Sequence, residues 1–347
     1  MYEIAIGQSD NVGFDVIPDK ISSQNKTYDV LLIAYLRGGT TFLGEMLGFR
    51  NENFYIYEPL HNLTTFGYFK PGFLCSMMDE SCRRNNQTDD QVLDVIRGIY
   101  NCDSRKYRHL LQSWHYIKSM GQQKFSACSK TRNGCPEKYF NQCSTAVSKV
   151  SKIPRISIGL ASKLLTEFPN LKIIHLLRDP RAIMNSRYRL KWTPVPGGAL
   201  SLCKKMKSDY QESIQVKKTH PGRLYTVFYE ALAQNNLETF KDIYNFIGYQ
   251  FDKEDHLRLT KMTASTKDGP VDDTRRHDSA KTARKWRYQI NTNVLIETNK
   301  ACSELYRLLG YPQLKSIHEL KNESIPLNNP TFQENTNENV LIFYVCK

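Results

Sequence analysis

The sequence predicts an α/β fold in which helices flank a central parallel sheet, and two observations support that prediction. Short, almost purely apolar runs alternate along the chain with amphipathic helical stretches, as buried parallel strands and their crossover helices do. The first apolar run, 30–36, leads directly into a glycine turn at 37–41 and then into a helix. With 347 residues and 40% hydrophobic content, the chain can bury the core of one elaborated domain or of two.

The glycine turn after the first strand has the composition of an anion site. Gly38 and Gly39 permit a tight turn with exposed N–H groups, and Thr40 and Thr41 place hydroxyls at the start of the helix. Phe42 begins a helical apolar repeat, so the turn lies where the helix dipole adds positive charge. A nucleoside-triphosphate loop would read GxxxxGK[ST], and this turn lacks that Lys. The turn therefore suits the 5′-phosphate of a sulfuryl donor, without an obligatory metal.

The remaining elements follow the same alternation of apolar runs and helical repeats. A loop is expected at 192–198, which reads WTPVPGG. We predict strands at 54–57, 173–177 and 224–229, a strand that ends at Lys152, and helices within 90–116 and at 159–168, 200–217 and 237–246.

A second anion element follows the strand at 173–177. Arg178 comes directly after that strand, and Ser186 lies eight positions later, on the first turns of a helix. Asp179 and Pro180 suit the cap and the first position of that helix. Arg178 and Ser186 could therefore both reach one phosphate group.

These motifs resemble the Golgi carbohydrate 6-O-sulfotransferase family, the type that includes GlcNAc, Gal and GalNAc 6-O-sulfotransferases, chondroitin 6-sulfotransferase and keratan sulfotransferase. The family opens close to RSGSSFLGELL and FYLFEPL, where this chain has RGGTTFLGEML and FYIYEPL. Segment 170–190 resembles the family's Arg-Asp-Pro-Arg element, and 285–311 resembles its KWR…C…LGY tail. The chain departs from the family pattern at Pro154, Phe228 and Ala231.

The resemblance implies a sulfotransferase domain at residues 29–311 with a P-loop-like fold. Such a domain uses 3′-phosphoadenosine-5′-phosphosulfate (PAPS) as its sulfuryl donor. A cysteine-rich insertion would occupy about 64–147, between an N-terminal segment, 1–28, and a tail, 312–347. The donor would be PAPS, with no metal required. The acceptor would be an acidic or neutral glycan, sulfated by in-line displacement at the 6-hydroxyl of GlcNAc, Gal or GalNAc. A homodimer is compatible with the sequence.

The resemblance also implies catalytic roles. Glu58, directly after the second strand, is our candidate for the base, and Arg37 and Lys152 are the candidate cations at the transferred group. An ordinary Glu is a weak base at neutral pH, so Glu58 would need burial or a matched hydrogen bond to act.

Donor-binding roles follow the matched motifs in the same way. Arg155 resembles the Arg of the family's K-x-x-R element and would enter the acceptor cleft. His61 could line that cleft or be structural, whereas His175 and Trp286 are interpreted as buried core residues. The implied donor contacts are Gly38, Gly39, Thr40, Thr41 and Phe42 with Arg37 at the 5′-phosphate, Arg178 and Ser186 at the 3′-phosphate, and Arg276 and Ser279 elsewhere on the nucleotide.

The net charge of the chain limits the classes of partner that it is expected to bind. A formal net charge of +13 and a pI near 9.2 favour anionic partners such as a nucleotide, an acidic glycan, nucleic acid or a membrane surface. No RNP, zinc-finger or helix-turn-helix pattern occurs, so no nucleic-acid partner is expected.

Nine cysteines without repeated CxxC pairs favour disulfides over a zinc site. The family resemblance implies that Cys203 pairs with Cys302. An odd count leaves one cysteine over, and Cys346 is the candidate. The insertion could be held by two groups of cysteines, namely Cys75, Cys82 and Cys102, and Cys128, Cys135 and Cys143.

The family resemblance implies the Golgi lumen, where its members are type II membrane proteins. Residues 1–26 show neither a signal-peptide core nor the apolar length of an anchor, so we expect membrane attachment only through an anchor not present in this chain. A truncated chain, a missing first exon and a soluble relative all stay open. Four glycosylation sequons agree with a secretory lumen, at Asn25, Asn62, Asn86 and Asn322.

Three other functions compete with this interpretation. A nucleotide kinase would need the Lys that the glycine turn lacks. A tyrosylprotein sulfotransferase shares the Arg-x-Gly-Thr-Thr turn and the donor, but its later motifs resemble this chain less. An inactive glycan-binding relative would keep the fold and the basic charge. The joint presence of Arg37, Glu58, Arg178 and Ser186 argues against the inactive relative.

Overall fold

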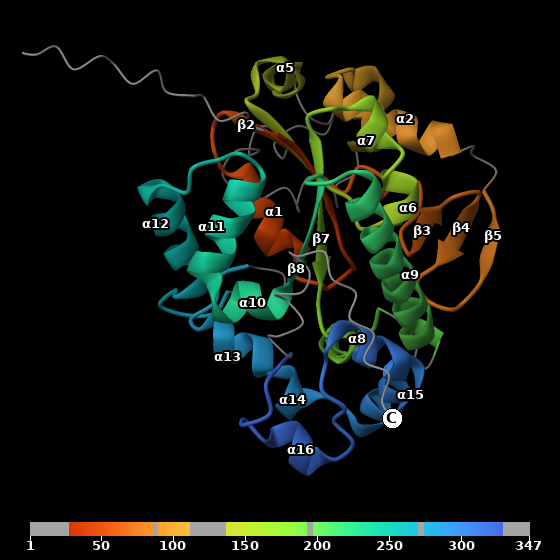
Figure 1. Ribbon diagram of the computed structural model, residues 1–347, viewed down its shortest axis with the longest axis vertical. Helices are drawn as coiled ribbons and strands as arrows, with labels where there is room; N and C mark the ends of the chain where they lie inside the picture. The colour runs from red at the N-terminus through yellow and green to blue at the C-terminus, as the bar shows by residue number, and fades with distance from the viewer. Residues whose placement is uncertain (1–27, 86–88, 112–136, 193–196, 270–273, 329–347) are drawn as a thin grey trace, which may run out of the picture.

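The central feature of the fold is a parallel sheet of five strands between two layers of helices (Figure 1). The structure is a computed structural model that describes residues 28–85, 89–111, 137–192, 197–269 and 274–328. The strand order is β2-β6-β1-β7-β8, which confirms the predicted α/β class. The strands are β1 (Asp29–Ile33), β2 (Asn53–Tyr57), β6 (Ser148–Lys152), β7 (Leu171–Leu177) and β8 (Leu224–Phe228).

The central strand β1 is shorter than its apolar run predicts. Val30 to Ala34 are completely buried, because β6 and β7 flank the strand and helices cover both faces. The chain leaves the sheet after Ile33, and the N–H of Gly38 donates to the carbonyl of Tyr35 at 2.7 Å. Residues 34–36 were predicted as strand but belong to the turn that enters the site.

Helices cover both faces of the sheet, with α1, α10, α11 and α12 on one side and α6, α7 and α9 on the other (Figure 1). Among the described residues, no helix combines the length and the apolar character needed to cross a membrane. The helices are α1 (Thr40–Gly48), α2 (Asp89–Tyr100), α5 (Glu137–Thr145), α6 (Ile158–Ala161), α7 (Leu164–Glu167), α8 (Pro180–Arg189), α9 (Gly197–Thr219), α10 (Tyr229–Gln234), α11 (Asn236–Phe246), α12 (Lys253–Thr263), α13 (Ser279–Arg284), α14 (Trp286–Gln289), α15 (Thr292–Leu309) and α16 (Ile317–Lys321).

Three predicted helix boundaries differ from the structure. The predicted helix at 159–168 is two short helices, α6 and α7. Helix α9 begins at Gly197, inside the predicted loop 192–198, of which 193–196 lie outside the described residues. Helix α2 ends at Tyr100, and two 3₁₀ turns, Ser104–Lys106 and Arg108–Leu111, follow it.

The insertion carries a small antiparallel sheet of β3 (Gly67–Lys70), β4 (Phe73–Ser76) and β5 (Cys82–Arg84). The disulfide Cys75–Cys82 joins β4 to β5. A second disulfide links Cys102 to Cys143, across the two cysteine groups that the sequence suggested.

A third disulfide, Cys203–Cys302, confirms the expected pairing and ties α9 to α15. Cys128, Cys135 and Cys346 lie outside the described residues.

Two residues expected in the core are found there. His175 in β7 is fully buried, and both ring nitrogens are bonded, to Tyr35 at 2.9 Å and to Ser213 at 2.7 Å. Burial lowers the pKa of His175 to about 4, so the ring is neutral at physiological pH. Trp286 is also buried, in a cluster with Leu295, Leu314 and Leu320.

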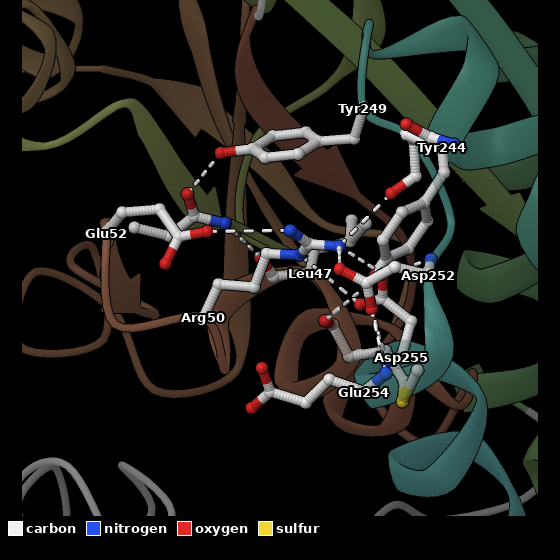
Figure 2. A network of polar contacts seen from close by, with 11 residues as sticks. Leu47, Arg50, Glu52, Tyr244, Tyr249, Asp252, Glu254 and Asp255 are labelled. Atoms are coloured by element: carbon white, nitrogen blue, oxygen red, sulfur yellow. Dashed lines mark hydrogen bonds and ion pairs between the residues drawn. The ribbon is translucent and has the colours of Figure 1, made fainter. Parts of the chain in front are cut away.

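Figure 2 shows an ion-pair network that anchors α12 beside α1. The guanidinium of Arg50, after α1, pairs with the buried carboxylate of Asp255 and lies 3.0 Å from that of Asp252. Asp252 and Asp255 form a capping box at the start of α12. Because Met262 and Thr263 at the other end of α12 line the main pocket, this network helps to fix one pocket wall.

Candidate active site

The main pocket lies at the carboxyl edge of the sheet, where all five strands deliver a residue to it. Glu58 follows β2, Lys152 ends β6, the turn 37–41 follows β1, Arg178 follows β7 and Tyr229 follows β8. Parallel strands end at one edge, and open α/β sheets bind ligands there. The sequence-predicted residues in the lining are Arg37, Gly39, Thr40, Thr41, Phe42, Glu58, Lys152, Arg178, Arg276 and Ser279.

The glycine turn needs its glycines for two different reasons. Gly39 has φ +89°, and a Cβ there would lie 2.3 Å from the ring of Tyr229. A Cβ on Gly38 would lie 2.8 Å from the carbonyl oxygen of Tyr35. Gly38 is not itself part of the lining, and it tightens the turn from behind.

Helix α1 begins at this turn without a side-chain cap and without an acidic residue in its first turn. The first N–H groups of a helix have no partner within the helix, and the helix dipole makes them electropositive. The turn and the start of α1 therefore present backbone donors and two threonines to an anion, as the sequence predicts.

The two predicted phosphate motifs are in direct contact. Nε of Arg37 donates to Oγ of Ser186 at 3.0 Å, and Nη1 of Arg178 donates to the carbonyl of Arg37 at 2.9 Å. Ser186 thus bonds to Arg37, and it stands behind the lining. The Arg178 guanidinium lies 4.1 Å from the ring centroid of Tyr229.

One N–H donor of the Arg178 guanidinium is not used by the contacts described above. Its Nε is buried and has no hydrogen-bond partner among the described residues. An unpaired buried guanidinium donor in a pocket wall is costly unless a ligand completes it. A phosphate oxygen is a suitable acceptor, so the residues present fit a phosphorylated ligand.

Glu58 and Lys152 form a buried ion pair in the pocket wall, beside the glycine turn. Lys152 Nζ lies 2.7 Å from Oε1 of Glu58 and 3.3 Å from Oγ1 of Thr41. The guanidinium of Arg155 pairs with the second carboxylate oxygen of Glu58. Glu58 has φ +44°, a conformation that is strained for a residue with a side chain and is typical of functional sites.

Charge pairing decides the protonation state of this pair. Burial alone would raise the pKa of Glu58, but the charges of Lys152 and Arg155 outweigh burial and hold it well below its ordinary value. Burial alone would lower the pKa of Lys152, but the carboxylate of Glu58 raises it. From the sequence, Glu58 was expected to need burial or a matched hydrogen bond to act as a base. Glu58 is buried, but the two cations beside it lower its pKa and weaken it as a base.

Arg155 organises the segment after Glu58, toward the cleft expected for the acceptor. Its guanidinium donates to the carbonyls of Thr64, at 2.7 Å, and Thr65, at 2.9 Å. It also lies 2.8 Å from Nδ1 of His61. Arg155 is buried and His61 is partly exposed, so Arg155 supports this segment from beneath.

Arg276 and Ser279 close the remaining wall. Ser279, at the start of α13, donates its hydroxyl to the carbonyl of Ala233 at 2.7 Å. The backbone N–H of Arg276 donates to the carbonyl of Met262 at 2.8 Å, which joins this segment to α12.

Two aromatic residues of the lining, Tyr57 and Tyr229, were not predicted from the sequence. Tyr229 follows β8 as Arg178 follows β7, so the position after a predicted strand was a usable signal. Within the described residues, no group of three or more His, Cys, Asp or Glu side chains could hold a metal ion.

The chain is similar to several known proteins. Carbohydrate sulfotransferase 1 of Danio rerio is 26% identical, over 88% of this chain and 83% of that protein. Carbohydrate sulfotransferase 3 of Homo sapiens is 24% identical, over 86% of this chain and 70% of that protein. Among solved structures, the sulfotransferase domain of the Synechococcus PCC 7002 olefin synthase has a TM-score of 0.43 and 21% identity, covering 82% of this chain and 96% of that one.

The sulfotransferase domain family model matches residues 27–310. The match takes in every strand of the main sheet and every sequence-predicted site residue. It covers well over half of the chain, and the chain therefore belongs to the sulfotransferase domain family.

Proposed function

We propose that this protein is a carbohydrate sulfotransferase that moves the sulfuryl group of PAPS to a sugar hydroxyl, the 6-hydroxyl of GlcNAc, Gal or GalNAc in a glycosaminoglycan or glycoprotein glycan. The position of Lys152 carries the proposal, because its Nζ contacts both Glu58 and Thr41 of the phosphate turn. It therefore stands between a carboxylate and the site of a 5′-phosphate. The carbohydrate sulfotransferases 1 and 3 noted above support a sugar acceptor.

The donor site is divided between the two phosphate motifs. The N–H groups of 38–42 and the Arg37 side chain bind the 5′-phosphate. Arg178 binds the 3′-phosphate together with Ser186, whose hydroxyl lies behind the pocket lining and leaves its bond to Arg37 to reach the phosphate. Arg276 and Ser279 border the rest of the nucleotide. PAPS supplies the sulfuryl group, and no metal is needed because cationic side chains neutralise its charge.

In the proposed reaction, Glu58 takes the proton of the sugar hydroxyl as that oxygen bonds to sulfur. The bond from sulfur to the 5′-phosphate oxygen breaks, and adenosine 3′,5′-bisphosphate leaves. Lys152 and Arg37 stabilise the negative charge that grows on the leaving oxygen. Held by two cations, Glu58 is a poor base. When Lys152 turns toward the 5′-phosphate side, Glu58 loses one of these charges and its pKa rises.

The remaining proposals concern the setting of the reaction. The net charge of +13 suits an acidic glycan, although a neutral glycan is compatible. The Golgi lumen is the proposed compartment, and the disulfides Cys75–Cys82, Cys102–Cys143 and Cys203–Cys302 agree with an oxidising lumen.

The proposal is tested by transfer of labelled sulfate from PAPS to desulfated chondroitin, desulfated keratan, N-acetyllactosamine and a tyrosine peptide, with Arg37→Ala as the blank. Label on a glycan that disappears in the variant supports the proposal and identifies the acceptor. Label on the peptide alone would show a tyrosylprotein sulfotransferase instead. Nucleotide binding without transfer to any acceptor would favour an inactive glycan-binding relative.

The role of Glu58 has its own test. Glu58→Gln removes the base, and we expect the transfer rate to fall by about 10²- to 10⁴-fold. Binding of adenosine 3′,5′-bisphosphate should not weaken, because the loss of the Glu58 charge leaves Lys152 free to pair with the 5′-phosphate. Transfer at near the wild-type rate would exclude Glu58 as the base.

A further inference from the structure

The buried carboxylate of Glu230 has no part in the proposed reaction. Glu230 lies in α10, one residue after Tyr229, and its side chain is sealed from solvent. Oε1 accepts the backbone N–H of Asp179 at 2.9 Å, and Oε2 accepts the hydroxyl of Tyr311 at 3.1 Å. A buried carboxylate is costly to keep, so its contacts need an explanation.

The first contact fixes the peptide group that follows Arg178. The N–H of Asp179 belongs to the peptide that joins Arg178 to Asp179, at the turn from β7 into α8. Asp179 is the cap of α8, and its carboxylate accepts the N–H of Arg181 at 2.9 Å and pairs with the Arg181 guanidinium at 2.7 Å. Glu230 therefore holds the backbone from which the Arg178 side chain enters the pocket.

Tyr229, the residue before Glu230, contacts the side chain of the same arginine, Arg178. The ring of Tyr229 packs against the guanidinium of Arg178 and against the face of Gly39, where a Cβ would collide with it. Tyr229 and Glu230 thus constrain Arg178 at its guanidinium and at its backbone. The pair also connects Arg178 to the glycine turn.

The second contact of Glu230, with the hydroxyl of Tyr311, links Tyr229 and Glu230 to the segment that follows α15. Tyr311 follows the left-handed Gly310 that ends α15, and it is buried. The carbonyl of Pro312 accepts Nη1 of Arg181 at 3.0 Å. The segment that follows α15 is therefore bonded to Glu230 and to Arg181, although neither Tyr311 nor Pro312 lines the pocket.

We propose that Glu230 and Tyr311 are positioning residues for the 3′-phosphate: they orient the turn that carries Arg178, so that its guanidinium and unpaired Nε face the phosphate. The proposal rests on the proposed function, because that function assigns Arg178 to the 3′-phosphate. It predicts that damage at Glu230 removes the affinity gained from the 3′-phosphate and leaves the rest of nucleotide binding in place.

The test compares adenosine 3′,5′-bisphosphate with adenosine 5′-phosphate by isothermal titration calorimetry. We expect Glu230→Ala to weaken bisphosphate binding at least tenfold and to change 5′-phosphate binding less than twofold. Glu230→Gln should stay within threefold for both nucleotides, because its amide oxygen can accept from Asp179 and its amide nitrogen can donate to Tyr311. In turnover, Glu230→Ala should raise KM for PAPS more than it lowers kcat.

Two tyrosine variants provide a matched pair. Tyr311→Phe removes only the hydroxyl that Glu230 accepts, and it should weaken bisphosphate binding about threefold or more. Tyr306→Phe, also in a buried site, removes a hydroxyl that has no partner among the described residues, and it should leave both affinities unchanged. If Glu230→Ala does not fold, Tyr311→Phe carries the test.

Three outcomes would overturn the assignment. The first is a Glu230→Ala protein that keeps the wild-type ratio of the two affinities, and the second is one that loses both affinities equally. The third is a Tyr311→Phe protein indistinguishable from Tyr306→Phe. Failure of the proposed function looks different, because the wild-type protein itself would then bind the two nucleotides equally well.

Discussion

The same buried glutamate gives a quantitative prediction about stability and pH. Burial, with the repulsion of Asp179 added, raises the pKa of Glu230 from its ordinary value of 4.5 to about 7. The backbone N–H of Asp179 and the charge of Arg178 offset part of this effect. In the unfolded chain Glu230 regains its ordinary pKa, so between pH 4.5 and 7 the folded protein holds a proton that the unfolded chain has lost.

The sign and the size of the resulting change in stability follow from proton linkage. Stability falls with rising pH wherever the folded state binds more protons than the unfolded state. The contribution of Glu230 is fully present below pH 4.5 and is lost as the pH rises through 7. At about 1.4 kcal/mol for each pH unit, the whole loss is about 3 kcal/mol. Glu230→Gln cannot titrate, so its free energy of unfolding should rise relative to wild type by about 3 kcal/mol between pH 4.5 and pH 8.

The assay is urea unfolding of both proteins at intervals from pH 4.5 to pH 8. The quantity to compare is the difference in free energy of unfolding between the two proteins at each pH. The other titrating groups are common to both proteins, so their contributions cancel in this difference. An offset of equal size at every pH, added to this pH-dependent difference, would reflect altered hydrogen-bond geometry and leave the reasoning intact. A difference that stays flat across this range, or that runs the opposite way, would refute the claim that the buried carboxylate holds its proton.

Three further predictions concern stability, each measured by urea unfolding at neutral pH. Arg50→Ala should cost about 3–5 kcal/mol, because it leaves the fully buried Asp255 charge uncompensated, and a loss below about 1 kcal/mol would count against the anchoring of α12. Replacing Cys203 and Cys302 by Ser should cost about 4 kcal/mol, since the disulfide closes a loop with a separation of 99 residues, and unchanged stability would argue against the bond. Gly39→Ala should cost about 1–3 kcal/mol through its positive φ and its ring contact, and a variant as stable as wild type would contradict the geometry of the turn.

Much of the site could be predicted because its signals are local. The glycine turn at 37–41 and the residues that follow β2 and β7, Glu58 and Arg178, come directly after apolar runs. In a parallel sheet, that placement alone brings them to one edge. The Cys203–Cys302 bond came from family resemblance, since spacing alone does not determine which cysteines pair.

What could not be predicted depends on contacts between distant segments. The ion pair of Glu58 with Arg155 needs the register that sets Tyr57 opposite Lys152 in β2 and β6, and no pattern in the sequence gives that register. The direction of the Glu58 pKa depends on the same contact. The bond from Asp179 to Glu230 likewise joins two strand ends that come together only once β7 and β8 are paired.

The placement of Lys152 gives the proposed reaction an internal order. While Lys152 and Arg155 both hold Glu58, its low pKa makes it a poor acceptor for a sugar proton. A phosphate at the turn near Thr41 competes with Glu58 for the Lys152 ammonium, which lies within hydrogen-bonding distance of both side chains. The base is therefore strengthened when the donor site is filled. Under the proposed roles, one lysine links occupation of the donor site to activation of the acceptor, so proton removal and sulfuryl transfer are coupled without a conformational change in the sheet.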